Sequence, residues 1–111
     1  MDRVEALTDE LLREIRGNEI YQEYVRQRDR VSADPELFER VEQCRRMNYQ
    51  MQMDQTLDHF TLEDEVNRQM SEMRNIPEVN SYLHAELALC REIQKICRTL
   101  IEGIDFTAPD F

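Results

Sequence analysis

Two cysteines near the C-terminal end, Cys90 and Cys97, have the clearest capacity for chemistry in this 111-residue sequence, because thiolates bind zinc and iron–sulfur clusters. They stand seven residues apart, about 10 Å along a helix, so they cannot hold one zinc ion without further ligands. An iron–sulfur or redox-sensing site that several chains share is one interpretation. We favour a second one, in which Cys90, Cys97 and also Cys44 fill tight apolar helix positions as small, weakly polar side chains.

Two histidines and one carboxylate are the other candidates for chemistry. His59 and His84 lie far apart in the sequence without a well-placed carboxylate, and we predict that both lie at the surface, His59 in a loop. Glu86 interrupts an apolar stripe, where a carboxylate must be paired or solvated. We expect Arg45 or Arg46 to pair with it, or Glu86 to specify the register of the helix against a partner. A hydrolase or ligand-binding site built on Glu86 is the alternative, although no second acid or nucleophile accompanies it.

Methionines gather in the middle of the chain, where their flexible thioethers suit an adaptable binding surface. Ordinary core filling is the alternative interpretation. The residues that we predict to form a partner-binding or oligomer interface are Met47, Met51, Met70, Met73, Tyr82, Glu86 and Leu89.

No motif of an enzyme is present: the sequence lacks a glycine-rich phosphate loop, a nucleophile elbow and a zinc signature. We therefore predict no catalytic residue, no metal ligand and no enzymatic activity. The net charge of −10 argues against nucleic-acid binding through the general field of the protein. Acidic neighbours dilute the arginine-rich stretches, so we expect an ion-paired surface there, with a local RNA contact as the alternative.

Helices must position these residues, because two glycines, three prolines and 34% charged residues suit helices better than strands. The longest pattern recurs at alternating steps of four and three residues, and we call it the seam: Val79, Leu83, Glu86, Cys90, Ile93, Cys97, Leu100 and Ile104. This heptad spacing predicts one long helix, which starts with Pro77 in its first turn and ends near Gly103. Leu89 and Ile96 widen the apolar face, so we expect several neighbours to bury it.

Four shorter helices are expected before the long one. The first runs from about Asp2 to Arg16 and stops at Gly17, and Asn18 caps the second. Asp34 and Pro35 open the third helix. The remaining boundaries are an exposed connection over 54–60 and a capping box at Thr61 that opens the fourth helix. The predicted fold is all-α: a single five-helix, antiparallel bundle-like domain over residues 1–111, with 105–111 as a tail.

The cellular location follows from what the sequence contains. It shows no secretory signal and no run of about 20 apolar residues. Three cysteines, an odd number, indicate reduced thiols rather than a disulfide framework. We expect a cytoplasmic protein without membrane insertion.

Three stretches carry a resemblance to a known family. They are Glu19–Tyr24 (EIYQEY), Asp34–Phe38 (DPELF) and Ile76–Cys90 (IPEVNSYLHAELALC), and the closing Glu102–Phe106 (EGIDF) adds to them. In the order and spacing of these stretches, the chain resembles the YlbF/YmcA family of small bacterial regulators, and its clostridial-type members in particular, over nearly the whole length.

The resemblance implies a compact helical fold that associates into dimers or larger assemblies, and a non-enzymatic adaptor role. Members of the family join a complex that influences the ribonuclease RNase Y, and through it mRNA processing, competence, biofilm formation and sporulation. Such complexes have been associated with iron–sulfur clusters, but no cysteine follows Cys97 here, so we expect no cofactor. The expected partners are further copies of the chain, related YlbF/YmcA-type helical proteins or the RNase Y complex.

Overall fold

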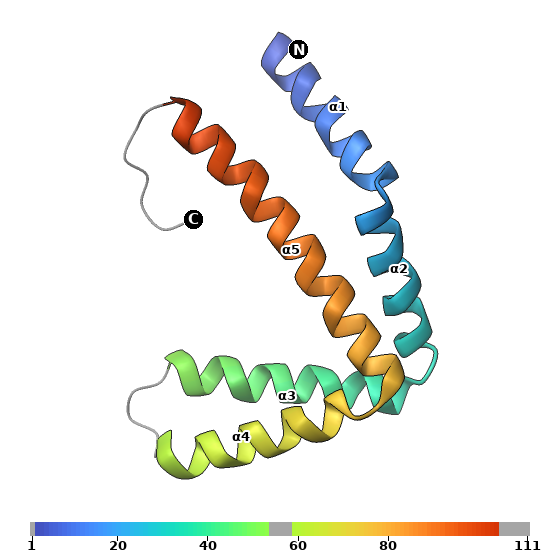
Figure 1. Ribbon diagram of the computed structural model, residues 1–111, viewed down its shortest axis with the longest axis vertical. Helices are drawn as coiled ribbons and strands as arrows, with labels where there is room; N and C mark the ends of the chain where they lie inside the picture. Colours follow the sequence, from blue (N-terminus) through green and yellow to red (C-terminus); the bar gives the residue numbers. More distant parts are fainter. Residues whose placement is uncertain (1, 54–58, 105–111) are drawn as a thin grey trace. The chain divides into compact units, whose positions relative to one another are not determined.

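The structure is a computed structural model that describes residues 2–53 and 59–104, with no account of the side chains of 59–62. These residues form five helices and no strand (Figure 1). The helices are α1 (Arg3–Gly17), α2 (Glu19–Ser32), α3 (Pro35–Met53), α4 (His59–Arg74) and α5 (Pro77–Ile104). The predicted all-α fold with five helices and a long C-terminal helix is confirmed.

Local capping explains the first three boundaries. The Asp2 carboxylate accepts a hydrogen bond from the Glu5 N–H at 2.8 Å and caps α1. Asn18 serves two helices, since its N–H donates to the Ile15 carbonyl at 3.1 Å and its side chain accepts from the Ile20 N–H at 2.9 Å. These bonds satisfy backbone groups that the helix ends would otherwise leave unpaired. The breaks expected around residues 17–18 are confirmed.

The start of α3 also follows the sequence. The Asp34 carboxylate accepts a hydrogen bond from the Leu37 N–H at 3.2 Å, and Pro35 is the first residue of the helix. Proline suits that position because its missing N–H would have no partner there. Pro77 takes the same place in α5, as predicted.

The predicted start of the fourth helix is wrong. The fourth helix begins at His59, so Thr61 lies inside its first turn and His59 is not in a loop; residues 54–58 lie outside the described part. Gly103 lies within the last turn of α5, which ends one residue later at Ile104, so the predicted end near Gly103 is confirmed. One helical glycine costs only about 1 kcal/mol relative to alanine, less than the surrounding helix supplies. The predicted tail, 105–111, lies outside the described residues.

The described residues divide into two compact units, which are treated separately below. The α1/α5 unit consists of residues 2–25 and 84–104, and the α3/α4 unit of residues 26–53 and 59–83. Helices α2 and α5 each contribute to both units. The single domain expected over 1–111 stays a prediction.

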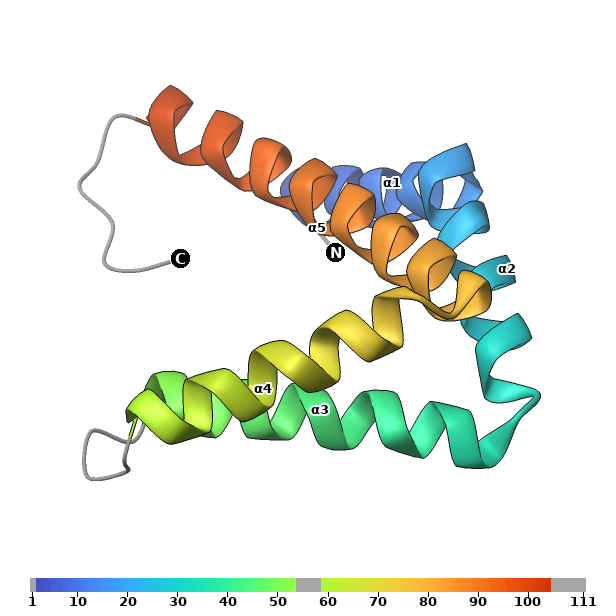
Figure 2. The ribbon, with the colours of Figure 1, turned by 60° about the horizontal axis from the view of Figure 1, so that its bottom comes forward.

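The α3/α4 unit holds most of the buried side chains. Helices α3 and α4 run side by side in opposite directions (Figures 1 and 2). The end of α2 and the beginning of α5 complete the core, whose buried members are Val31, Val41, Cys44, Val66, Met73, Val79 and Tyr82. An ion pair from Arg30 to Glu78, 3.4 Å between Nη2 and Oε1, joins α2 to α5. Because both side chains are partly exposed, that pair contributes only about 0–1 kcal/mol.

The α1/α5 unit buries very little. Helix α1 has no buried residue, and Ala85 is the only buried residue among those described in this unit. The expectation that several neighbours bury the seam is therefore wrong beyond the first turns of α5. The physical reason is that α1 covers one flank of the helix, the side with Leu89 and Ile96, and leaves the seam itself uncovered.

Candidate functional site

The methionines predicted as an adaptable surface fall into two classes. Met73 is buried in the core of the α3/α4 unit, with 4% of its surface exposed. Met47, Met51 and Met70 are half-buried, and Met53 at the end of α3 is exposed. Met73 therefore fills the core, whereas the adaptable binding surface stays a prediction for the methionines that retain some accessible surface.

The side chain of Met70 contacts the buried Cys44. The Sγ of Cys44 lies 3.0 Å from the Sδ of Met70, so the two sulfurs pack α3 against α4. Burial raises the pKa of the Cys44 thiol, and the nearby Arg74 guanidinium opposes this only in part. A thiol that stays protonated is a poor nucleophile. The prediction that Cys44 fills the core is confirmed.

Tyr82 is a second predicted interface residue that the structure places in the core. Its side chain is 2% exposed, its ring centroid lies 6.3 Å from that of Phe38, and the Arg45 guanidinium carbon lies 5.2 Å from its ring centroid. This is the geometry of a cation–π contact beside an aromatic pair. In the described arrangement Tyr82 therefore supports α3 and presents little surface to a partner.

The expected partners of Glu86 lie in the other unit. Arg46 contacts Glu39 at 2.8 Å, and the Nε of Arg45 lies 3.8 Å from the Glu42 carboxylate. Glu86 itself is half-buried on α5, in the α1/α5 unit. Its pairing with an arginine of α3 stays a prediction, and so does the alternative of a site built on this carboxylate.

A polar cavity between α3 and α4 was not foreseen. It measures about 230 Å³ and is lined by Arg40, Gln43, Cys44, Arg68, Gln69, Glu72 and Met73. Arg68 contacts Glu65 at 2.6 Å and Glu72 at 3.1 Å, and its hydrogen bond holds the pKa of the Glu65 carboxyl below the usual range. The spacing of Arg68, three and four residues from these acids, is the one sequence signal for the network.

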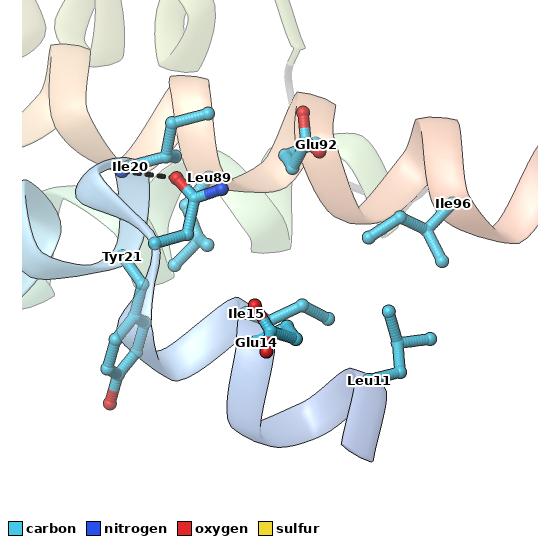
Figure 3. Close-up of a pocket in the computed structure, with 9 residues that line it drawn as sticks. Leu11, Glu14, Ile15, Ile20, Tyr21, Leu89, Glu92 and Ile96 are labelled. Carbon is cyan, nitrogen blue, oxygen red and sulfur yellow. Dashed lines mark hydrogen bonds between the residues drawn. The ribbon is translucent and has the colours of Figure 1, made fainter. Parts of the chain in front are cut away.

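A groove lies between α1 and α5 within the α1/α5 unit. It measures about 240 Å³, and its lining residues are Leu11, Glu14, Ile15, Asn18, Ile20, Tyr21, Leu89, Glu92 and Ile96. Figure 3 shows Leu11 on α1 and Ile96 on α5 facing each other across it. Leu89, a predicted interface residue, is half-buried in this wall. Of the lining residues, the sequence pattern identified Leu89 and Ile96 beside the seam, but not that α1 would face them.

The exposed apolar side chains form the largest departure from prediction. On α1 they are Val4, Leu7, Leu11 and Leu12, on the last part of α5 they are Leu87, Ile93, Leu100 and Ile104, and on α3 they are Tyr49 and Met53. On α3, steps of four and three residues join Leu37, Val41, Cys44, Asn48 and Met51, and Tyr49 lies outside this pattern, so periodicity did not identify it.

The two thiols on α5 belong to this exposed surface. Cys90 and Cys97 are both exposed, so the prediction that they fill a tight core within the chain is wrong. The reason is again the absence of a covering helix over the seam. Among the described residues, no three histidine, cysteine or acidic side chains converge as a metal site would require, and His84 is exposed, as predicted.

None of the helices in the described part of the chain combines the length and the apolar character needed to cross a lipid bilayer.

Comparison with known proteins gives one match. The family model described as control of competence regulator ComK, YlbF/YmcA, matches residues 4–105. Searches of curated proteins and of solved structures found no match. The family match includes all five helices, and therefore both the exposed face of α1 and α5 and the α3/α4 hairpin.

Proposed function

The chain belongs to the YlbF/YmcA family of competence regulators, and from this premise we propose that it acts by binding other proteins and not by catalysis. It resides in the cytoplasm and associates with further copies of itself. Its further partners are related helical proteins of the family or the RNase Y complex, through which it influences mRNA processing, competence, biofilm formation and sporulation.

One observation carries this proposal: the chain leaves large apolar side chains on three helices in contact with water. Ile93, Leu100 and Ile104 on α5 are examples, and Val4 on α1 is 73% exposed. Several large apolar side chains exposed on one helix are typical of a surface that makes protein–protein contacts. Burying each such side chain in an interface contributes about 1.5–3 kcal/mol, which favours association.

Exposed side chains at the end of α3 are evidence for binding of a protein other than a second copy of the chain. Tyr49 and Met53 stand one turn apart and are 63% and 66% exposed, and Met47 and Met51 are half-buried on the same helix. Tyrosine and methionine are enriched in protein interfaces because they supply large, adaptable contact area.

Affinity capture from the native cell tests the proposal. The bait is the full chain, and the expected co-purifying proteins are RNase Y and other helical members of the family. A bait with Tyr49→Lys and Met53→Lys should capture at least tenfold less of them. The matched control carries Gln50→Lys and Gln52→Lys, which adds the same charge at exposed positions of the same helix and should capture normally.

Two outcomes would contradict the proposal. Capture of no specific protein by the wild-type bait would remove the adaptor role. Equal loss of capture with both variants would show that added charge, and not the apolar end of α3, weakens the contact.

A further inference from the structure

The polar cavity between α3 and α4 and the groove between α1 and α5 differ in the charges that line them. The cavity has side chains of both signs, Arg40, Arg68 and Glu72, and Arg68 is paired with Glu72 at 3.1 Å. The lining of the groove contains two carboxylates, Glu14 and Glu92, and no basic residue. The groove therefore has a charge of −2 that its own lining does not compensate, and it attracts cations.

The two carboxylates come from opposite walls of the groove. Figure 3 shows Glu14 on α1 and Glu92 on α5. Glu92 is half-buried, whereas Glu14 is exposed. Among the described residues, neither carboxylate takes part in an ion pair. Both are therefore available to a ligand that carries positive charge.

Apolar side chains line the space between the two walls. Leu11 and Ile15 come from α1, and Leu89 and Ile96 come from α5. Methylene groups that enter this space leave water, which is favourable. The volume of about 240 Å³ lies below the roughly 300–1,000 Å³ of sites for drug-sized ligands, so the groove suits a small, unbranched chain.

We propose that the groove between α1 and α5 binds a linear aliphatic diamine, a small molecule with an ammonium group at each end of a methylene chain. One ammonium group pairs with Glu14 and the other with Glu92, while the methylenes lie against the apolar lining. Aliphatic amines keep their charge at pH 7, and each ammonium group donates up to three hydrogen bonds. This inference goes beyond the proposed function, which concerns protein partners only.

The same lining disfavours other occupants. A lysine side chain of another protein has one ammonium group and would leave either Glu14 or Glu92 unpaired. A whole helix, about 10 Å across, is too wide for a groove of this volume to enclose. A calcium ion takes six to eight oxygen ligands, more than two carboxylates with an apolar surface between them supply. A diamine matches both the charges and the apolar surface between them.

Saturation-transfer NMR of 1,6-diaminohexane with the purified full chain tests the proposal. The extended length of this diamine is comparable with the roughly 8–10 Å that separates the axes of packed helices. The wild type should transfer magnetisation to its methylene protons, and a titration gives the dissociation constant. Glu14→Gln with Glu92→Gln removes both charges but keeps the size of the side chains, and it should weaken binding at least fivefold.

The matched control is Asp9→Asn with Glu102→Gln. It removes the same charge from exposed positions of the same two helices, outside the lining of the groove, and should bind like the wild type. Equal weakening by the two double variants would overturn the proposal, because the negative charge of the whole chain would then explain the binding.

A series of ligands tests the wild type without any substitution. Hexylamine has one ammonium group and should bind at least threefold more weakly than 1,6-diaminohexane. The shorter 1,4-diaminobutane should also bind more weakly, because it buries fewer methylenes. Equal binding of hexylamine and 1,6-diaminohexane would overturn the pairing with two carboxylates. Absence of saturation transfer to 1,6-diaminohexane would overturn the proposal and leave the groove to a segment of another protein.

Discussion

The α3/α4 unit and the α1/α5 unit are built from the same kind of amphipathic helix, but the first buries its apolar side chains and the second leaves most of them exposed. In the first, Val31, Val41, Val66 and Val79 are at most 2% exposed. In the second, four apolar residues of α1 are at least 39% exposed, and only Ala85 among the described residues is buried. The difference lies in the number of neighbours. Four helical segments enclose the first core, whereas in the second unit α1 covers only one flank of α5.

The contrast indicates that the α3/α4 unit contributes mainly to the stability of the fold and the α1/α5 unit mainly to the proposed binding. Side chains of the α3/α4 unit stabilise the folded chain, because their apolar surface is already removed from water. Side chains of the α1/α5 unit keep much of their apolar surface in water. The favourable free energy of burying that surface is therefore still available to the proposed association. Substitutions in the two units should therefore change different measured quantities.

The largest effect is expected at Tyr82. Replacing it with alanine removes a ring that is 2% exposed and contacts Phe38 and Arg45, so the free energy of unfolding should fall by about 3–5 kcal/mol. Urea unfolding followed by circular dichroism measures this. Tyr49→Ala, at an exposed tyrosine of α3, is the control and should change stability by less than about 0.5 kcal/mol. Similar losses from both would contradict the assigned core.

A pair of valines compares the units directly. Val79→Ala should lower the free energy of unfolding by about 2 kcal/mol, since Val79 is 0% exposed. Val4→Ala, at a valine that is 73% exposed, should leave the unfolding of the monomer nearly unchanged. The measurement is urea unfolding at protein concentrations low enough to exclude the proposed self-association. If Val4→Ala proved the more costly change, the α1/α5 unit would have a core of its own.

Thiol labelling sharpens the same contrast. Cys44 is buried and burial raises its pKa, whereas Cys90 and Cys97 are exposed. At pH 7 in dilute solution, iodoacetamide should modify the two thiols of α5 at least tenfold faster than Cys44, because the reagent needs an accessible thiolate. Peptide mass spectrometry over time reads the three rates. With the proposed self-association, Cys90 and Cys97 should become slower at high protein concentration while Cys44 does not change.

The smallest effect is expected at the Arg68 network. Hydrogen bonds from Arg68 and Gln69 lower the pKa of Glu65, so the folded state favours its ionised form. The contribution to stability is therefore present above the ordinary pKa of 4.5 and is lost as the pH falls through the lowered value. Glu65→Gln should lower the unfolding temperature slightly at pH 7 and not at all at acidic pH. A difference that persisted in acid would exclude this ionic cause.

The number and kind of helices were predictable because their signals are local. Asp34 and Pro35 begin α3, Asn18 separates α1 from α2, and Pro77 opens α5 through contacts within a few residues. The start of α4 escaped prediction because a capping pattern at Thr61 is equally compatible with a position inside a helical turn. Signals of this kind specify helix but leave the terminal residue open.

The candidate site was predictable only in part. Periodicity identified the seam and the apolar residues Leu89 and Ile96 beside it, but it does not predict how many neighbouring helices will cover them. The buried Val79 and the exposed Leu100 share the same seam spacing in the sequence. Their difference depends on residues far away along the chain, so no local pattern contains it. The groove between α1 and α5 was missed for the same reason.

By itself, the amino-acid sequence determined five helices, their apolar faces and a heptad-spaced stripe on α5. These properties follow from backbone capping and from the 3.6-residue period of the helix. Only the tertiary structure decided which faces are covered, because burial requires several segments at one place in space. In the tertiary structure four helical segments surround Val79, whereas Leu100 is exposed to water. The exposed surface around Leu100 is available for the proposed protein contacts.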